Sequence, residues 1–469
     1  MFKNEPKKDE YYKSKLKQEA LECMQSLSTH GLRNLFSTKY NTLRVMWFFL
    51  TLGSSCLSVY FIGKILLEYL QFNVATEVRL VDLEMIEFPT ISVCNKNKFS
   101  SKYSIGYVKN LVENNRKKIE EKSNYHDQDW IQIQNKLSLK ETDAKYLYSI
   151  VPVEERQNYS MTFSESLLTC EFNKKKCNHF DFEWYFNSKY GNCYRFNSNG
   201  SKFNNKRVHQ EYGLILDLYV GQPKELDIFG HESGAYVSID SKETNTYSFF
   251  DNLIEISNGV ETSIQLEKSL FTKYPKPYSN CDFYNLSINE LNLDQIHYYN
   301  KVISANFSYS QSMCILFCRY DMFYNRNITT CKLTSNSLKV PNIKYCQVKQ
   351  MNLTREDIVN IEQMENRYYD SLNEICLNQC PLECERIKYD TYIFTNKYPK
   401  MNLDLAKYML NRSLIERDKE IQSNDFIRLK IFYGSLSQIE YKESPSMTLF
   451  GLISNLGGVL GLFLGIKLN

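Results

Sequence analysis

An excess of charge of one sign is missing from this chain. Its 57 lysines and arginines nearly balance its 54 aspartates and glutamates, which leaves a formal net charge of +3 over 469 residues. Without a basic excess, nothing marks the chain as a binder of nucleic acid or another polyanion. Internal repeats and low-complexity linkers are absent as well.

Catalytic signatures are also missing. The chain has no HExxH, no GxSxG and no glycine-rich phosphate loop before Lys-Ser/Thr. A zinc site built from Cys376, Cys380 and Cys384 would have no histidine nearby, and an oxidising compartment would pair such thiols instead. We therefore expect no enzyme activity, no cofactor and no metal site.

Long hydrophobic runs are scarce, and only two can cross a bilayer. Spanning about 30 Å of hydrocarbon takes about 20 residues, and residues 45–63 and 447–466 alone are long and uncharged enough. Arg33, Lys39 and Arg44 precede the first run, so the positive-inside rule places the N-terminus in the cytosol. A second crossing returns the chain to the cytosol, so we expect both termini there. The expected segments are 1–42, cytosolic; 43–69, first span; 70–446, extracellular; and 447–469, second span and pore.

Cysteines and glycosylation sequons both indicate that the segment between the spans is extracellular. Of the 14 cysteines, 12 fall there, an even number suited to disulfides, whereas Cys23 and Cys56 do not, and we expect them to be reduced. The extracellular cysteines are Cys94, Cys170, Cys177, Cys193, Cys281, Cys314, Cys318, Cys331, Cys346, Cys376, Cys380 and Cys384. The sequons are at Asn158, Asn199, Asn285, Asn306, Asn327, Asn352 and Asn411.

Strand patterns flank each hydrophobic run. After the first run, Val78, Leu80, Leu83 and Met85 show the spacing of a half-buried strand. Residues 426–441 form a matching strand before the second run, so each span connects to a strand through a few residues. We further expect strands at 213–220 and 236–239 and a helix from 355 to about 380. These elements predict a mixed α+β extracellular domain.

Small residues and cysteine spacing predict two kinds of helix contact. Gly53, Ser54 and Ser55 in the first span allow another helix to approach closely. Cys376, Cys380 and Cys384 recur every four residues, as do Cys314 and Cys318. This spacing stacks thiols on one helical face, so we expect each cysteine to pair with a different segment.

Seven short motifs occur along the chain in a fixed order. They are "STHGLRNLF" with His30 and Gly31, "FPTISVCN" from Phe88, "CEFNKKKCNHF" from Cys170, "YGNCYRFN" from Tyr190, "PYSNC" from Pro277, "CPLEC" from Cys380 and "GGVLGLFLG" from Gly457. In sequence and order they resemble the degenerin / epithelial sodium channel superfamily, over nearly all of residues 28–469. The chain is similar to an invertebrate-type subunit of peptide-gated or degenerin-like channels.

This resemblance implies an integral membrane α+β fold. Two transmembrane helices would carry a large, disulfide-rich, clenched-hand ectodomain with a palm sheet, a helical thumb, a finger, a β-ball and a knuckle. The palm strands would fall at 78–94 and 426–441, the thumb at 277–384 and the finger at 100–166. The resemblance also implies a homo- or heterotrimer with related subunits in the plasma membrane bilayer, which conducts sodium ions and is often blocked by amiloride.

Glycines in the second span match the family's pore helix. Gly457, Gly461 and Gly465 are four residues apart and share one helical face, so three helices can approach one axis and expose backbone carbonyls to a dehydrating cation. Without the family, we would favour simple helix packing over a pore as the explanation of this stripe; with the family, we favour the pore. The resemblance places the narrowest ring at Gly465, Ile466 and Lys467. It aligns Asn455 with a pore-mouth aspartate of acid-sensing members.

The resemblance implies gating residues too. His30 and Gly31 match the cytosolic gating motif, Ser454 matches a small residue whose bulky replacement holds family pores open, and Tyr278 would press on Phe72 to couple the thumb to the first helix. Acid-sensing members carry Tyr-His-His after the first span, where this chain has "LQFNVAT". A proton switch is therefore poorly supported, and gating by an extracellular peptide or by mechanical force stays open.

Lys467 departs from the family pattern. Three ammonium groups in the constriction would repel sodium and be costly to dehydrate, and the family continues beyond this point with a half helix and an acidic residue. Two explanations account for Lys467 and the missing half helix. We favour a gene model truncated after Asn469; the alternative is a subunit that conducts poorly alone. The alternative function is a non-conducting, receptor-like or modulatory subunit of the same family. A two-pass ATP-gated trimer is a third option, but its lysine cluster after the first span is absent.

Overall fold

The structure is a computed structural model that falls into two compact units. It describes residues 38–98, 153–187, 190–198, 203–221, 233–241, 253–279, 281–282, 293–304, 309–325, 355–399 and 422–465, with single positions at 15, 19, 34, 35, 101, 103, 104 and 106. Unit 1 comprises Met1–Glu77, Lys273–Asn280 and Lys442–Asn469, and unit 2 comprises Val78–Thr272 and Cys281–Tyr441.

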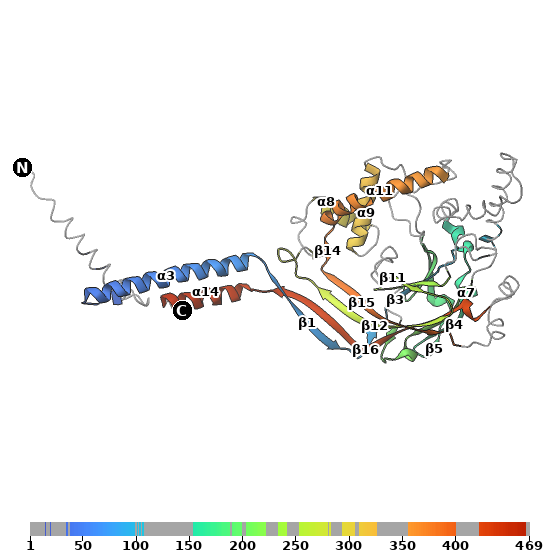
Figure 1. Cartoon of the computed structure of the whole chain (residues 1–469), viewed down its shortest axis with the longest axis horizontal. Helices are drawn as coiled ribbons and strands as arrows, with labels where there is room; N and C mark the ends of the chain where they lie inside the picture. The colour runs from blue at the N-terminus through green and yellow to red at the C-terminus, as the bar shows by residue number, and fades with distance from the viewer. Residues whose placement is uncertain are drawn as a thin grey trace, which may run out of the picture. The chain divides into compact units, whose positions relative to one another are not determined.

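Two apolar helices dominate unit 1. Helix α3 spans Asn41–Leu70 and helix α14 spans Leu449–Leu464, and the two pack side by side (Figure 1). They run antiparallel, because the chain just after α3 meets the chain just before α14: the Ser446 N–H donates to the Asn73 carbonyl at 2.9 Å. Both hydrophobic runs of the sequence are therefore helical, as predicted.

The two helices differ in length. Helix α3 has 30 residues, or about 45 Å at 1.5 Å per residue, and is the one described helix that is long and apolar enough to cross a membrane by itself. Helix α14 has 16 residues, or about 24 Å, and is a shorter apolar helix. Together they are consistent with two spans.

A seven-stranded sheet forms the base of unit 2. Its strand order is β15-β12-β16-β9-β4-β5, and β1 pairs with β16 beside this path. Strand β1 follows α3 and β16 precedes α14, so each apolar helix leads into a strand of this sheet, as the sequence predicts. The strands are β1 Val74–Asp82, β4 Leu167–Phe172, β5 Lys175–Lys176, β9 Leu214–Tyr219, β12 Val260–Thr272, β15 Glu385–Lys397 and β16 Phe426–Pro445.

A five-stranded sheet, with the order β11-β10-β3-β7-β6, shares its core with the first sheet. Fully buried Phe196 and Val237 of this sheet belong to one cluster with Leu216 and Ile431 of the larger sheet. The disulfide Cys94–Cys193 joins its neighbouring strands β3 and β7. The strands are β3 Thr90–Asn95, β6 Phe182–Asn187, β7 Gly191–Phe196, β10 Ala235–Asp240 and β11 Leu253–Ile256.

The predicted palm segment 78–94 is not one strand. Strand β1 belongs to the seven-stranded sheet, a short strand β2 (Ile86–Glu87) pairs with β8 (Asn204–Asn205), and β3 belongs to the five-stranded sheet. Pro89 lies between β2 and β3. Because proline has no N–H to donate to a ladder, it ends one strand before the next begins.

The predicted half-burial of the first strand is wrong for the single chain. Val78 is 59% exposed and Leu80 is 68% exposed, although both lie on β1 at the spacing expected for one covered face. Nothing in the described part of the chain covers these two side chains.

Three helices form a separate cluster in unit 2 (Figure 1). They are α8 (Leu293–Ser304), α9 (Gln311–Asn325) and α11 (Arg355–Gln379), and α11 matches the helix predicted at 355–380. Val302, Met313 and Phe317 form their buried core together with four cysteines. The predicted finger, 100–166, lies mostly outside the described residues.

Candidate pore and gating site

Both ends of α14 have a local chemical cause. The Thr448 hydroxyl accepts a hydrogen bond from the Gly451 N–H at 3.1 Å, which satisfies one of the unpaired donors at a helix start. At the other end, Gly465 adopts the left-handed conformation, with φ 68° and ψ 18°. A side chain there would strain the backbone. Helix α14 therefore ends where the predicted constriction begins.

The glycine-rich side of α14 faces away from α3. Phe463 contacts α3. At about 100° per residue, the opposite side of α14 lies roughly 140° to 200° around the helix axis from Phe463. This side carries Ser454, Gly458 and Gly461. Ser454 and Gly458 are exposed and Gly461 is partly exposed, and no atom lies within 4 Å of a Cβ placed on Gly458. Within the described part of unit 1, this side of α14 is open.

The other predicted pore residues divide into two groups. Asn455 is exposed, Gly457 is partly exposed and Gly465 is buried. Ile466 and Lys467 lie outside the described residues, as do the gating residues His30 and Gly31. The pore and gating roles of all these residues stay predictions.

An aromatic cluster lies at the end of α3. The rings of Phe72 and Tyr278 meet edge to face, with centroids 5.4 Å apart and an interplanar angle of 86°. Tyr69 lies 6.4 Å from Phe72, and Tyr274 lies 5.1 Å from Tyr278. Partial shielding from water raises the pKa of Tyr278, so its phenol stays neutral. The pair named from the sequence is thus in contact, and its role in gating stays a prediction.

One carboxylate ties the segment that carries Tyr278 to the chain that precedes α14. Glu443 is near the end of β16, and its Oε2 accepts hydrogen bonds from the Tyr274 N–H at 3.1 Å and from the Ser279 hydroxyl. All these residues belong to unit 1. Movement of residues 273–279 is therefore opposed by bonds to the strand that continues into α14.

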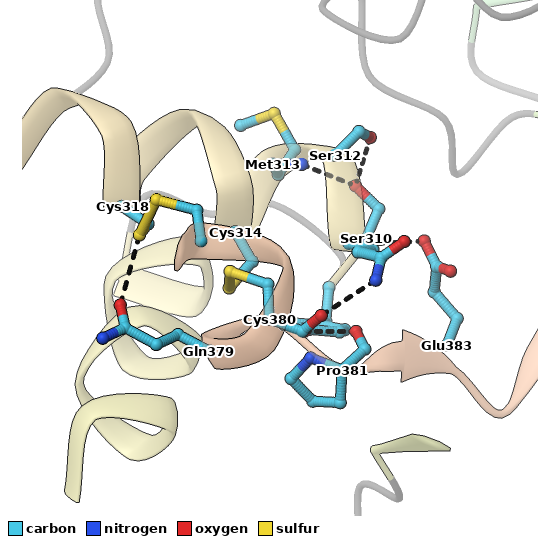
Figure 2. Close-up of a disulfide and its surroundings, with 12 residues drawn as sticks. Ser310, Ser312, Met313, Cys314, Cys318, Gln379, Cys380, Pro381 and Glu383 are labelled. Atoms are coloured by element: carbon cyan, nitrogen blue, oxygen red, sulfur yellow. Dashed lines mark hydrogen bonds between the residues drawn. A yellow bond between two sulfur atoms is a disulfide. The ribbon is translucent and has the colours of Figure 1, made fainter. Parts of the chain in front are cut away.

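Two disulfides join α9 to α11 one helical turn apart. Cys314 pairs with Cys380 and Cys318 pairs with Cys376, with Cα separations of 5.7 Å and 5.8 Å (Figure 2). The expectation that each cysteine pairs with a different segment is therefore wrong. Two antiparallel helices place residues at i and i+4 opposite each other, so two stacked thiols of one helix can both bond the same neighbour.

The second cysteine of the "CPLEC" motif, Cys384, lies beyond the end of α11. Cys384 follows the short strand β14 (Leu382–Glu383), which pairs in parallel with β13 (Cys281–Asp282), and Cys384 bonds Cys281. In the same motif Glu383 accepts a hydrogen bond from the Gln311 N–H at 2.8 Å, at the start of α9. A carboxylate at a helix N-terminus is stabilised by the helix dipole.

Of the remaining predicted cysteines and sequons, some lie within the described residues and others do not. Cys170 pairs with Cys177 and closes the β4–β5 hairpin, and Cys56 is free, as expected. Cys23, Cys331 and Cys346 lie outside the described residues. Asn158 is exposed, as a glycan would require, and the other six sequon asparagines, Asn199, Asn285, Asn306, Asn327, Asn352 and Asn411, lie outside the described residues.

Several contacts escaped the sequence-based predictions. Ser54 donates a hydrogen bond to Phe463, and the only signal for it was the small-residue cluster in the first span. By contrast, Gly53 of that cluster has no atom within 4 Å of an added Cβ. Asp217 forms a buried ion pair with Arg428, and a charged residue inside the apolar run "GLILDLYV" could have indicated it. Nothing local indicated Glu443.

Comparison with known proteins gives consistent matches. Residues 23–467 match the family described as amiloride-sensitive sodium channel. Epithelial sodium channel subunit gamma of Rattus norvegicus is 26% identical over 323 residues, which are 67% of this chain and 46% of that protein. The bile acid-sensitive ion channel of Homo sapiens is 24% identical over 456 residues, which are 94% of this chain and 82% of that protein. The chain spans somewhat less than half the length of the gamma subunits that it matches.

The family match covers nearly the whole chain and agrees with the ordered motifs, the two apolar helices and the disulfide-bonded, β-rich ectodomain. The family model describes sodium channels, and the relatives named above are sodium channel subunits and an ion channel, not enzymes. The chain therefore belongs to the amiloride-sensitive sodium channel family, within the degenerin / epithelial sodium channel superfamily.

Proposed function

We propose that this chain is a pore-forming subunit of a trimeric, sodium-selective channel in the plasma membrane, with both termini in the cytosol. The observation that carries the proposal is the open, glycine-rich side of α14, which ends at the left-handed Gly465. Three such sides around one axis would form a narrow, polar path, because the absence of side chains lets backbone carbonyls face the ions. Amiloride block is expected from the family.

Gating in this proposal starts outside the membrane. An extracellular stimulus, such as a peptide ligand, moves residues 273–279, and these act on the two helices through the Phe72–Tyr278 ring pair and the Glu443 hydrogen bonds. Short connections support this route, because three residues separate α3 from β1 and three separate β16 from α14. A displaced strand therefore pulls directly on a helix.

Cysteine accessibility tests the pore assignment. In a Cys56→Ser background, Ser454→Cys and Gly458→Cys should each make the amiloride-sensitive current of oocytes sensitive to a charged methanethiosulfonate reagent applied from outside. Ile453→Cys is the matched control, since Ile453 is at the same depth and 53% exposed but about 100° away from Ser454. Modification of Ile453→Cys alone would contradict the assignment. No current under peptide, acid or stretch, with surface delivery confirmed, would contradict the channel function.

Lys467 supports a second candidate, a non-conducting, receptor-like or modulatory subunit. Its ammonium group follows Gly465 by two residues, and a ring of such groups would repel cations. Lys467→Ser separates the two candidates. Current that appears only in this variant favours the modulatory subunit, whereas current in the unmodified chain favours the pore-forming subunit.

A further inference from the structure

The hydroxyl of Ser54 contacts the end of the second helix. Ser54 lies in α3, and its Oγ donates to the carbonyl of Phe463 at 2.9 Å. A hydroxyl has one proton, and the competing acceptor within α3, the Thr51 carbonyl, is farther away at 3.4 Å. The shorter bond therefore joins the two helices.

The carbonyl that Ser54 contacts is one that α14 itself does not pair. The last carbonyls of a helix lack a partner within it. The Gly465 N–H bonds the Gly461 carbonyl at 3.0 Å, and α14 ends at Leu464 with Gly465 as its left-handed cap, so no N–H of the described part of the second helix reaches the Phe463 carbonyl. In a bilayer such a carbonyl needs a donor from a neighbouring segment. Ser54 supplies that donor.

A second contact from α3 holds the same residue. The rings of Phe61 and Phe463 are stacked, with centroids 5.5 Å apart and an interplanar angle of 18°. Ser54 and Phe61 are two helical turns apart on one face of α3. In a helix, carbonyls point toward the C-terminus and side chains lean toward the N-terminus. The Phe463 carbonyl and the Phe463 ring therefore point in opposite directions along α14. Since α3 runs antiparallel to α14, the carbonyl meets Ser54 and the ring meets Phe61, which comes later in α3.

Ser58 lies between these two residues and provides a matched control. It is 1% exposed, one turn from Ser54 and on the same face, yet its hydroxyl has no hydrogen-bond partner among the described residues. Substituting Ser58 therefore changes the size and polarity of the same face without removing a bond between the helices.

We infer that Ser54 is a positioning residue for ion selectivity: its hydroxyl fixes the Phe463 carbonyl and, through it, the orientation of Gly465. This inference rests on the proposed function, which places the constriction at Gly465. The first helix would thereby set the geometry of a ring that it does not itself line. Loss of the bond would let the end of α14 rotate and would loosen the fit around a dehydrated sodium ion.

The first test measures the permeability ratio of sodium over potassium in oocytes. Ser54→Ala should lower this ratio about threefold, which corresponds to the ~0.6 kcal/mol typical of a hydrogen bond between membrane helices. Ser54→Thr keeps a hydroxyl and should restore the ratio, and Ser58→Ala should leave it unchanged. A merely structural role would change current size at constant selectivity, and that outcome would overturn the inference.

A backbone ester tests the acceptor. An ester in place of the amide between Phe463 and Leu464 weakens the Phe463 carbonyl as an acceptor. It should lower the permeability ratio in the unmodified background but have no further effect in Ser54→Ala. An ester between Val459 and Leu460, which also removes one helical N–H, is the control and should act equally in both backgrounds. Equal effects of the first ester in both backgrounds would also overturn the inference.

A cross-linking test does not depend on current. The starting chain carries Cys56→Ser, Phe61→Cys and Phe463→Cys, and a short bifunctional thiol reagent should cross-link its two helices. Adding Ser54→Ala should slow this cross-linking about threefold. Adding Ser58→Ala should leave the rate unchanged. If the unmodified chain carries no current but Ser54→Ala slows cross-linking, the proposed channel function fails and the positioning of Phe463 by Ser54 stands. If Ser54→Ala alters neither selectivity nor cross-linking, the inference fails.

Discussion

Phe72 combines a bulky side chain with an uncommon backbone conformation. Its φ of 51° lies in the left-handed region, which residues other than glycine seldom occupy. The conformation places its ring against Tyr278 at the end of α3. A strained residue persists when surrounding contacts hold it, so the aromatic cluster and the backbone of Phe72 stabilise each other.

The ring pair should behave as one energetic unit. Phe72→Ala and Tyr278→Ala should each reduce the stimulated current, and the double substitution should add little, because an edge-to-face pair couples its members by about 0.5 to 1.5 kcal/mol. Tyr278→Phe keeps the ring and is the control. Current at matched surface expression measures this, and strictly additive losses would show that the rings act independently.

Asp217 is the most deeply buried charge in the large sheet, with its side chain 5% exposed. It faces Arg428 across the β9–β16 ladder. The Asp217 carboxylate accepts from Arg428 Nε at 2.7 Å and Nη2 at 3.0 Å, and from the Thr169 hydroxyl at 2.6 Å. The two bonds from Arg428 are charge-assisted, and such bidentate pairs are stronger than hydrogen bonds between neutral groups. These bonds raise the pKa of Arg428.

Removal of this charge should destabilise the ectodomain. Asp217→Asn leaves Arg428 without its bidentate partner and should cost about 3 kcal/mol, seen as a lower melting temperature of the detergent-purified protein by tryptophan fluorescence. Asp390→Asn is the control, because Asp390 pairs with Lys388 at a surface where both side chains are more than 40% exposed and such pairs contribute about 0 to 1 kcal/mol. Equal shifts for both variants would contradict the burial argument.

The same pair also makes a prediction for pH. A raised pKa in the folded state means that the stabilisation from Arg428 is fully present below the ordinary pKa of an arginine side chain. It is lost only as the pH rises through the folded-state pKa. The destabilisation by Asp217→Asn should therefore be the same at any pH from about 6 to 9. If the loss of stability caused by Asp217→Asn changed with pH within this range, another titrating group would be contributing to the stability of the Asp217–Arg428 pair.

At the scale of elements, α9 and α11 are joined twice. The two disulfides close segments of 66 and 58 residues, and each alone would restrict the unfolded chain by about 4 kcal/mol in the loop-entropy model. Once one bridge is in place, the other closes only a small additional loop. Their contributions therefore overlap.

Removal of the bridges should be more than additive. Cys314→Ser with Cys380→Ser, or Cys318→Ser with Cys376→Ser, should each lower the melting temperature modestly, because the remaining bridge still holds the helices together. All four substitutions should cost more than the sum of the two pairs and should reduce surface delivery. Additive losses would indicate that each bridge acts through local packing and not through the shared loop.

At the scale of the whole molecule, apolar side chains remain uncovered on two strands. Val78 and Leu80 lie on β1, and Tyr392, Ile393 and Phe394 on β15 are 50%, 46% and 54% exposed. Strand β15 is an edge of the seven-stranded sheet. Exposed apolar residues on edge strands indicate contact with another chain. The proposed trimer provides such a partner.

Charge on this surface should therefore impair assembly. Leu80→Asp should shift the detergent-purified protein from trimer to monomer in mass measurements, because a buried carboxylate at a subunit interface lacks a partner. Phe180→Asp is the control, since Phe180 is 84% exposed and lies on the 3-10 helix His179–Asp181, which is part of neither strand. A trimer that tolerates Leu80→Asp would place β1 outside the interface.

Periodicity and composition explain the elements that were predicted correctly. Uncharged runs of about 20 residues form helices in lipid because a helix satisfies all its backbone hydrogen bonds within one segment, and α3 and α14 were predicted on this ground. Strand β16 and helix α11 also matched their predicted segments, because side-chain spacing encodes the covered face of an element. These signals are local, and each is contained in one short window of sequence.

Pairing between distant segments was not predictable in the same way. The partition of 78–94 between two sheets, the double bridge between α9 and α11, and the Glu443 hydrogen bonds all depend on which segments become neighbours. Spacing shows that Cys314 and Cys318 share a face but not which segment that face meets. The choice depends on the packing of the whole unit.

The sequence alone determined that this chain has two apolar helices around a cysteine-rich, β-rich body and that it belongs to a sodium channel family, because length, hydropathy and ordered motifs persist in any single chain. Only the tertiary structure decided that Ser54 holds the carbonyl of Phe463 and that the glycine side of α14 faces away from α3. The physical reason is that a hydrogen bond or ring contact requires two groups within a few ångströms, and folding alone brings residues 54 and 463 that close.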